Sequence, residues 1–334
     1  MGLTEEFAKL LRFHRKAAGM SQEELAAVGD LEPACISQLE NGLESPTLNT
    51  VERLAKCLRV SPAQLLEEIA VKEELRLRVE NDYVRRSAKP LSLRREAESI
   101  EFSAEVLISS IDTAHELIDQ LYAVELDIAA ILGMRNLSAF IGELYASAVV
   151  KNSNGLFKAN PHQDGYPDLL LMDRSGRKEW NRVGHLKGHK KPFSPFSGGG
   201  IEVKATCGDV PEPAECRRRF NIEKPGHGDT RIAYLTGYVW KAHHRETNNL
   251  AGLLWDFVDR RPRIVGLFYS SQLEVADWRR IQPPKDGGGR TTSVSRIEST
   301  GVRKLYDGWL CVINDRRYID FLNRKNRSQL IQPA

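Results

Sequence analysis

The stretch GGGIEVKAT, residues 198–206, places two charged side chains inside a short apolar run. Three glycines introduce the run, and its composition predicts a β-strand over 201–206. Side chains two positions apart in a strand point to the same face, so Glu202 and Lys204 project together. A charged pair in an apolar strand is costly to bury without a partner. The stretch therefore predicts a strand that carries a site.

A second run, PDLLLMD at 167–173, can supply the partner. It also has the composition of a strand, and if it lies beside 201–206, Asp168 comes next to Glu202. Two carboxylates form a hard-oxygen site for Mg²⁺, for which Mn²⁺ can substitute. Lys204 would orient or help to deprotonate an attacking water and neutralise phosphate charge, while the metal polarises the phosphate. The alternative for all three residues is a surface salt bridge.

The Pro-Asp at 167–168 and the Glu-Val-Lys at 202–204 resemble the signature of the PD-(D/E)XK nuclease superfamily. The resemblance implies an α+β or α/β fold, with a restriction-endonuclease-like mixed β-sheet flanked by helices. Nucleases of this superfamily often carry a further acid on the helix before the first catalytic strand. Glu143, in LSAFIGELYASAVV, has that position and is a candidate third metal ligand. The alternative for Glu143 is a solvent-facing helix residue.

Between the two predicted strands lies RSGRKEWNRVGHLKGHKKPFSPFSGGG, residues 174–200, which we interpret as a long basic loop. Loops of this length in compact domains tend to be functional. We expect it to reach over the DNA backbone or into a groove, with contacts from Lys187, Lys190 and Lys191. Several basic runs in one domain fit a phosphate-binding surface.

Downstream, the segments KAHHRETNNL (241–250), WDF (255–257) and ADWRRIQPPKDGGGRTTS (276–293) resemble the ApaLI-like restriction endonucleases. This resemblance runs from about residue 100 to the C-terminus and implies a palindromic DNA target of about six base pairs. Arginine can bind guanine, and asparagine can bind adenine, through two hydrogen bonds. Each candidate has the alternative of stabilising the fold. The candidates for reading bases or phosphates are His243, His244, Arg245, Asn248, Asn249, Arg290 and Thr291.

The rest of the chain suggests how this domain is built. Apolar residues recur at three- to five-residue intervals from Phe102 to Leu126, which predicts a packed helical layer over 101–150. Residues 71–100 are charged and weakly periodic, so we interpret them as a helix and linker. The nuclease domain is expected over 101–334, with its catalytic sheet and DNA-reading loops at 165–334. Further strands are predicted at 232–240, 252–258 and 263–270.

The segment SQEELAAVGDLEPACISQLENGLESPTLNTVERLAKCLRVSPAQLLE, residues 21–67, predicts a compact run of short helices. Ser21, with an acid three residues later, forms a capping box at the start of the first. Asn41-Gly42 tolerates positive φ and ends the second. Pro46 and Pro62 mark the starts of two more. An all-α domain is therefore expected over residues 1–70.

This pattern resembles the Cro/C1 (XRE) family of helix-turn-helix domains over residues 4–70. The resemblance implies that the helix at 32–40 enters the major groove of double-stranded DNA, while the start of the 21–28 helix contacts phosphates. Residues 1–70 hold seven Lys and Arg against eleven Asp and Glu, so the alternative is a bundle that serves dimerisation only. The implied contacts are Gln22 to the backbone, and Glu32, Pro33, Ser37 and Gln38 to base edges.

Composition fits a cytoplasmic bacterial protein without a membrane partner. Of the 334 residues 41% are hydrophobic and 28% charged, and no stretch approaches the roughly 18 consecutive apolar residues of a membrane span. The N-terminus lacks the pattern of a signal peptide. Five scattered cysteines, an odd number, are typical of reduced thiols.

Together these features predict a type II restriction endonuclease that makes Mg²⁺-dependent double-strand breaks. A palindrome presents two equivalent phosphates, so a homodimer is expected, with part of the helical pattern at 101–135 in its interface. A cognate DNA methyltransferase is expected in the same system, although not as a physical partner. Two alternatives stay open: a modification-dependent or repair endonuclease, and an XRE-type transcriptional repressor whose C-terminal domain is not catalytic.

Overall fold

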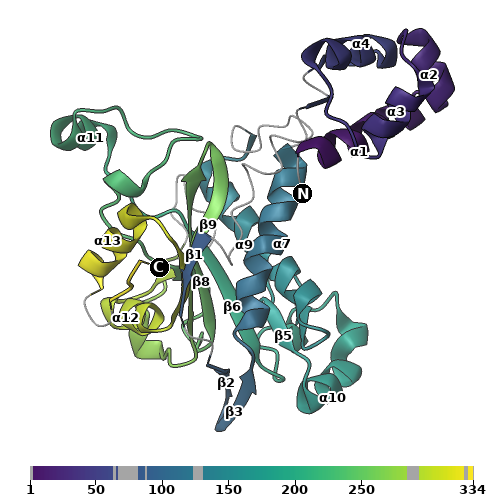
Figure 1. Ribbon diagram of the computed structural model, residues 1–334. Helices are drawn as coiled ribbons and strands as arrows, with labels where there is room; N and C mark the ends of the chain where they lie inside the picture. Colours follow the sequence, from purple (N-terminus) through teal and green to yellow (C-terminus); the bar gives the residue numbers. More distant parts are fainter. Residues whose placement is uncertain are drawn as a thin grey trace. The chain divides into compact units, whose positions relative to one another are not determined.

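The computed structural model divides the chain into two compact units, Met1–Arg76 and Leu77–Ala334 (Figure 1). No helix within the described ranges is long and apolar enough to cross a bilayer. The structure describes residues 3–62, 65–66, 82–86, 89–122, 131–283, 293–326 and 330–333.

Short helices build the first unit, as predicted. The hydroxyl of Ser21 accepts a hydrogen bond from the backbone N–H of Glu24, whose carboxylate accepts one from the N–H of Ser21, so the predicted capping box is present. The hydroxyl of Thr47 caps a later helix by accepting a hydrogen bond from the backbone N–H of Thr50. Apolar side chains that include Leu11, Leu25 and Leu54 form one core between the helices. The helices are α1 (Leu3–Ala17), α2 (Gln22–Val28), α3 (Pro33–Glu40) and α4 (Leu48–Leu58).

The second unit is built on a mixed seven-stranded sheet with the order β1-β11-β9-β8-β6-β5-β4. Strands β6 and β8 run parallel, and the other neighbours in this sheet run antiparallel. The strands are β1 (Tyr83–Arg85), β4 (Phe157–Ala159), β5 (Leu169–Leu171), β6 (Gly200–Thr206), β8 (Leu250–Val258), β9 (Arg261–Ser270) and β11 (Trp309–Ile313).

Helices cover both faces of this sheet (Figure 1). On one face α7 (Glu105–Tyr122) packs on β9, and α9 (Met134–Asn152) packs on β6. On the other face α12 (Ser299–Asp307) packs on β9, and α13 (Arg316–Lys325) packs on β11. A strand covered on both faces needs an apolar run rather than alternation, and β8 has the run LAGLLWDFV.

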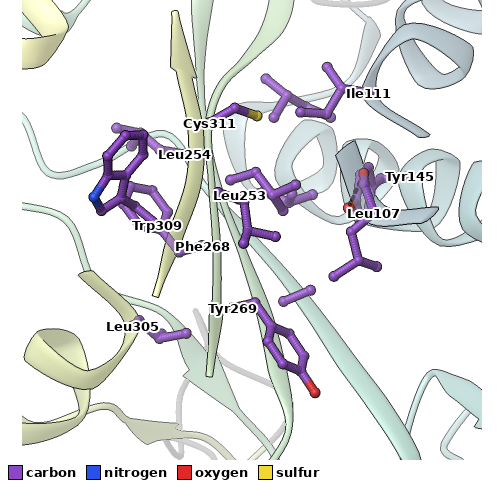
Figure 2. Packing of buried hydrophobic residues seen from close by; sticks show 14 of the residues in the cluster. Leu107, Ile111, Tyr145, Leu253, Leu254, Phe268, Tyr269, Leu305, Trp309 and Cys311 are labelled. Carbon is purple, nitrogen blue, oxygen red and sulfur yellow. Dashed lines mark hydrogen bonds between the residues drawn. The ribbon is translucent and has the colours of Figure 1, made fainter. Parts of the chain in front are cut away.

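The close-up of the core shows how neighbouring residues of β8 serve the two faces (Figure 2). Leu253 lies on the side of Leu107 and Tyr145, while Leu254 lies on the side of Trp309. All five belong to one buried cluster. The sheet is therefore held rigidly on both sides, and β6, which carries the predicted site, lies inside it rather than at an edge.

Four predicted strands and the helical layer are confirmed. The strands correspond to β5, β6, β8 and β9, and the layer to α7 and α9. The apolar side of α7 faces the sheet, because Leu107, Ile111 and Ile118 are buried in the core of their own chain. The apolar side of the described part of α7 is therefore used within its own chain, and the expectation of a dimer interface on this layer stays a prediction. Leu126, which also belonged to that pattern, lies outside the described residues.

Residues 232–240 are not a strand. They begin with a 3-10 turn, Ile232–Tyr234, which packs against α13. Asp256 on β8 accepts hydrogen bonds from the backbone N–H groups of Arg231 and Ile232 at 2.9 and 3.0 Å. Hydrogen bonds to a buried carboxylate on β8 therefore hold the start of this segment in place. The apolar pattern of residues 232–240 does not predict these bonds.

The linker prediction is wrong for the residues after 82. Strand β1 pairs with β11 at the edge of the sheet, and β2 (Leu91–Arg95) and β3 (Glu98–Phe102) form a hairpin. Alternate side chains of such strands face solvent, which explains their charge. Residues 71–81, also predicted as helix and linker, lie outside the described residues.

The predicted basic loop at 174–200 contains a ten-residue helix, α10 (Arg174–Val183). Asp173 caps it by accepting a hydrogen bond from the backbone N–H of Gly176 at 2.7 Å. The helix packs against β5, so this segment is more ordered than a loop prediction implies.

Candidate functional site

The pairing of β5 with β6 brings the two predicted acids together. Leu169 lies opposite Ile201 in the antiparallel register, so Asp168 lies beside Glu202. The backbone N–H of Val203 donates to Asp168 Oδ2 at 2.8 Å and fixes that carboxylate against β6. The predicted juxtaposition of Asp168 and Glu202 is confirmed.

A glycine permits this close pairing. A Cβ atom on Gly200 would lie 1.9 Å from the carbonyl oxygen of Leu169 and 2.7 Å from Cγ of Pro167. Any larger residue would therefore push β6 away from the start of β5. The Gly-Gly-Gly before the strand is in this sense part of the site.

Lys204 bridges the two carboxylates. Its Nζ lies 2.9 Å from Asp168 Oδ2 and 2.9 Å from Glu202 Oε1. The Glu202 side chain is only 3% exposed, against 28% for Asp168 and 21% for Lys204. The three side chains form a compact charged group that is open to solvent on the Asp168 side.

Burial sets the protonation of this group. Burial, and next the charge of Asp168, raise the pKa of Glu202 to about 7, although Lys204 acts in the opposite direction. Burial alone would lower the pKa of Lys204, but the two carboxylates outweigh it and hold that pKa above its usual value. In this arrangement the amino group of Lys204 stays protonated.

One carboxylate oxygen of the group is left for a ligand. Glu202 Oε2 is buried and has no hydrogen-bond partner in the part of the chain that the structure describes. A buried oxygen without a partner is costly, and a cation beside it removes that cost. Mg²⁺ is commonly held by one or two carboxylates together with water and substrate phosphate, so Asp168 and Glu202 fit such an ion.

Glu143 lies near this pair but does not complete a three-acid group. Burial, and next the charge of Asp168, raise the pKa of Glu143 on α9, so its carboxyl group faces the site. Across the described ranges, no three His, Cys, Asp or Glu side chains lie close enough together to hold a metal ion. The prediction of Glu143 as a third ligand is therefore not supported by this arrangement, in which Lys204 occupies the space between the strand acids.

Sequence reasoning missed Asn160, which holds the backbone before Asp168, and Tyr166, which lies beside His244. Asn160 Nδ2 donates to the carbonyl oxygens of Pro167 and Phe193 at 2.9 and 3.0 Å. The ring of Tyr166 lies 4.8 Å from that of His244. Asparagine before proline, as at 160–161, favours a turn, and this was the available signal for Asn160.

Several downstream candidates stabilise the fold instead of facing solvent. Asn249 is 3% exposed, and its side chain exchanges hydrogen bonds with the backbone of Arg94. Asn248 Oδ1 accepts a hydrogen bond from Asn249 Nδ2 at 3.0 Å. Arg245 donates to the carbonyl oxygens of Val275 and Trp278. The prediction that Asn249 reads bases is wrong, because its buried side chain forms hydrogen bonds with the backbone of the β2–β3 hairpin.

The other downstream candidates remain open. Burial lowers the pKa of His244, whose ring lies beside Tyr166 next to the site. His243 is exposed, with Nδ1 2.8 Å from the carbonyl oxygen of Ser293. Two candidates, Arg290 and Thr291, lie outside the described residues. The predicted backbone contacts Lys187, Lys190 and Lys191 are exposed after α10.

In the first unit the predicted base-reading residues lie on α3, with Glu32 and Pro33 at its start and Ser37 and Gln38 in its second half. Glu32 is the N-cap residue, and its side chain makes no capping hydrogen bond. Glu32, Pro33 and Gln38 are exposed and Ser37 is half-buried. Residues at the start of a recognition helix are those that meet base edges in this class of domain.

A buried ion pair fixes α3 against α1 and α2. Glu40 accepts hydrogen bonds from Arg15 at 2.6 and 2.9 Å, and from Gln22 Nε2 at 2.7 Å. The side chain of Glu40 is fully buried. Gln22, predicted to touch the DNA backbone, is thus held in place by α3.

The helices of the first unit define a helix-turn-helix protein. Residues 11–65 match the helix-turn-helix family HTH_3, and through them the chain belongs to that family. Over 59 residues the chain is 36% identical to the control protein C.BamHI of Bacillus amyloliquefaciens. That similarity covers 18% of this chain and 73% of the relative.

Solved structures resemble the same part of the chain. The restriction-modification controller protein C.AhdI from Aeromonas hydrophila is 32% identical, with coverage of 19% of this chain and 94% of that one and a TM-score of 0.18. The restriction-modification controller protein C.Esp1396I is 29% identical, with coverage of 23% and 99% and a TM-score of 0.21. The family match lies wholly within Met1–Arg76.

Proposed function

We propose that Leu77–Ala334 is a metal-dependent DNA endonuclease of the PD-(D/E)XK type. One observation carries the proposal: Asp168 and Glu202 lie on paired strands with Lys204 between them and a buried carboxylate oxygen left without a partner. A surface salt bridge is disfavoured as an explanation, because Glu202 is almost fully buried. Charges in such a place cost stability, which is typical of a functional site.

The side chains divide the work between them. Asp168 and Glu202 would hold a Mg²⁺ or Mn²⁺ ion, which when bound polarises the scissile phosphate and stabilises the leaving oxyanion. The Val203 N–H and Asn160 keep Asp168 in its position at the start of β5. Lys204 neutralises phosphate charge and orients the attacking water. Beside the two carboxylates the pKa of Lys204 is raised, which favours the charged form that orients the water over the neutral form that would deprotonate it.

The helix-turn-helix unit points to the biological setting. Similarity to a control protein favours a place in a restriction-modification system, so we propose a type II restriction endonuclease that acts on double-stranded DNA. A cognate methyltransferase would protect the host sites. The short palindromic target is part of the same proposal.

Cleavage of plasmid and phage DNA tests the proposal. We expect wild-type protein to cut in Mg²⁺ or Mn²⁺, and to bind without cutting in Ca²⁺ or EDTA. Asp168→Ala, Glu202→Gln and Lys204→Ala should each reduce cleavage by at least a hundredfold, because each removes charge from the reacting phosphate or its metal. Specific DNA binding should stay largely intact.

A matched control is the exposed pair Arg218 and Glu215 on α11 (Pro213–Phe220), whose alanine variants should cut normally. Full activity in EDTA, or in Glu202→Gln, would overturn the assignment. Cleavage of methylated but not unmodified DNA would indicate a modification-dependent enzyme instead of an ordinary restriction enzyme.

A transcriptional regulator is the second candidate function. The control-protein similarity favours it directly, since it concerns the first unit. In this case Leu77–Ala334 would not be catalytic. Repression of a promoter, with no cleavage of any tested DNA in Mg²⁺ or Mn²⁺, would select this alternative.

A further inference from the structure

A basic pocket lies at the start of α10, on the far end of β5 from Asp168. Among its lining residues two are apolar and three are cationic, and those cations are exposed. Lys158 on neighbouring β4 adds a fourth cation, with its Nζ 4.2 Å from the ring of Trp180 on α10. The pocket is lined by Leu156, Met172, Asp173, Arg174, Arg177, Lys178 and Asn181.

These cations differ from Arg182 and Arg217, two exposed arginines that pair with acids. Arg182 pairs with Glu179 at 2.5 Å, and Arg217 pairs with Glu223 at 3.0 Å. Arg174 and Lys178 have no acidic partner in the part of the chain that the structure describes, and Arg177 donates through Nε to a backbone carbonyl. Grouped like charges repel one another, and an anion between them relieves the repulsion.

The one acid of the pocket already has hydrogen-bond partners. Asp173 caps α10 and also accepts two hydrogen bonds of 3.0 Å from Arg95 of the β2–β3 hairpin. Arg95 also pairs with Glu98 at 2.6 Å, but three cations against the one acid Asp173 still give the lining of the pocket a net positive charge. An anionic ligand fits there.

Distance connects this pocket to the candidate active site. Met172 follows Asp168 by four residues, and an extended chain advances about 3.3 Å per residue, so the two lie roughly 13 Å apart. One strand of DNA carries a phosphate about every 3.4 Å along the helix axis. A duplex that runs along β5 with its scissile phosphate at Asp168 would therefore pass this pocket about four phosphates away.

We propose that Lys158, Arg174, Arg177 and Lys178 form a phosphate-binding surface that holds the DNA backbone beside the cleaved bond. The proposal rests on the proposed nuclease function for its choice of DNA as the partner. It assigns sequence-independent affinity to α10, separate from the base contacts of the helix-turn-helix unit.

The salt dependence of DNA binding tests this surface in the full-length chain. The triple variant Arg174→Gln/Arg177→Gln/Lys178→Gln is compared with Arg217→Gln/Arg218→Gln/Arg219→Gln on α11. The probe is a duplex of about 30 base pairs of arbitrary sequence, in EDTA to prevent cutting. Each lost phosphate contact lowers the slope of log K against log salt by about 0.9, so the α10 variant should lose up to about 3 in slope. The α11 variant should match wild type.

A second measurement does not depend on binding energy. A photo-cross-linking amino acid in place of Ser175, which is exposed between the cations, should attach to the DNA probe, whereas the same group in place of Arg218 should not. An unchanged slope without cross-linking at 175 overturns the proposal even if the protein cuts DNA. A lowered slope with cross-linking supports it even if no cleavage occurs. If the α10 variant lost its binding to heparin but kept its binding to DNA, the proposal would be overturned as well.

Discussion

Glu202 is the residue on which the site depends most. Its neighbours on β6 are apolar and packed in the core, so its position beside Asp168 is fixed by the fold rather than by its own charge. The sequence alone predicted Asp168, Glu202 and Lys204, because charges in an apolar strand are conspicuous. It could not predict Asn160 or the failure of Glu143 to join the pair, since both depend on packing between distant segments.

We predict that Glu202 makes the second unit less stable as pH rises. The pKa of Glu202 is raised from 4.5 to about 7 in the folded state, so its stabilisation is complete below 4.5 and is lost as pH rises towards 7. In metal-free buffer the free energy of unfolding should fall over this window. Glu202→Gln should remove the part that Glu202 contributes, at most about 3 kcal/mol, while Glu143 and Asp256, whose pKa values are also raised by burial, keep their part in both proteins. Urea denaturation followed by tryptophan fluorescence measures it, because all five tryptophans lie in Leu77–Ala334.

The difference between variant and wild type isolates Glu202 from other acids. Asp173, Asp277 and Asp315 have lowered pKa values, so their contribution is lost only at lower pH and is shared by both proteins. Adding Mg²⁺ at pH 7 should restore stability in wild type and not in Glu202→Gln. Parallel pH profiles for the two proteins would contradict the prediction.

At the scale of elements, long apolar runs were the reliable signal. Strands β8 and β9 are central and covered on both faces, so their sequences are mainly apolar, with long apolar runs in place of alternation. Strand β11 was missed because a five-residue run, WLCVI, does not distinguish a strand from a buried helix segment. Strand β1 was missed because its charged flanks resemble a linker, and only its pairing with β11 makes it a strand.

The buried pair of Arg15 and Glu40 should control the stability of the helix-turn-helix unit. Glu40→Ala leaves Arg15 as a buried cation without its carboxylate, which typically costs about 3–5 kcal/mol. Hydrogen exchange by mass spectrometry should show loss of protection across α1 to α4. Glu52→Ala is the control, because it breaks an exposed pair with Lys56 that contributes little to stability. Equal protection in both variants would refute the expectation.

Helix α3 should contribute affinity without setting the cleavage positions. Gln38 is exposed on α3, and loss of a two-bond contact to adenine costs about 1–3 kcal/mol. We expect Gln38→Ala to bind the sequence preferred by the wild type about 5- to 150-fold less tightly, as measured by fluorescence anisotropy. The control is Asn49→Ala, which changes an exposed residue of α4 and should bind normally. Sequencing of digested ends should give the same cut sites for both. A changed pattern would mean that α3 reads the cleavage target.

At the scale of the whole molecule, the two units differ in charge and are expected to contribute differently to DNA binding. The first unit carries more acids than bases, while the basic pocket and the exposed lysines after α10 belong to the second. The second unit is therefore expected to supply sequence-independent affinity and to set the cleavage positions, and the first unit to add affinity for a preferred sequence. The apolar pattern of α7 predicted an oligomer contact, but packing on β9 uses that face, as hydrophobic periodicity cannot tell a neighbouring sheet from a neighbouring chain.

We still expect a homodimer, because one site can attack one strand while a palindrome presents two equivalent phosphates. A two-fold assembly matches that symmetry and places one Asp168–Glu202 pair on each strand. Wild-type subunits mixed and exchanged with tagged Glu202→Gln subunits should give heterodimers that nick a supercoiled plasmid without linearising it. Homodimers of each kind are the controls, since wild type should linearise and the variant should leave the plasmid intact. A protein that sediments as a monomer with and without DNA, and yet makes both cuts in one binding event, would rule the dimer out.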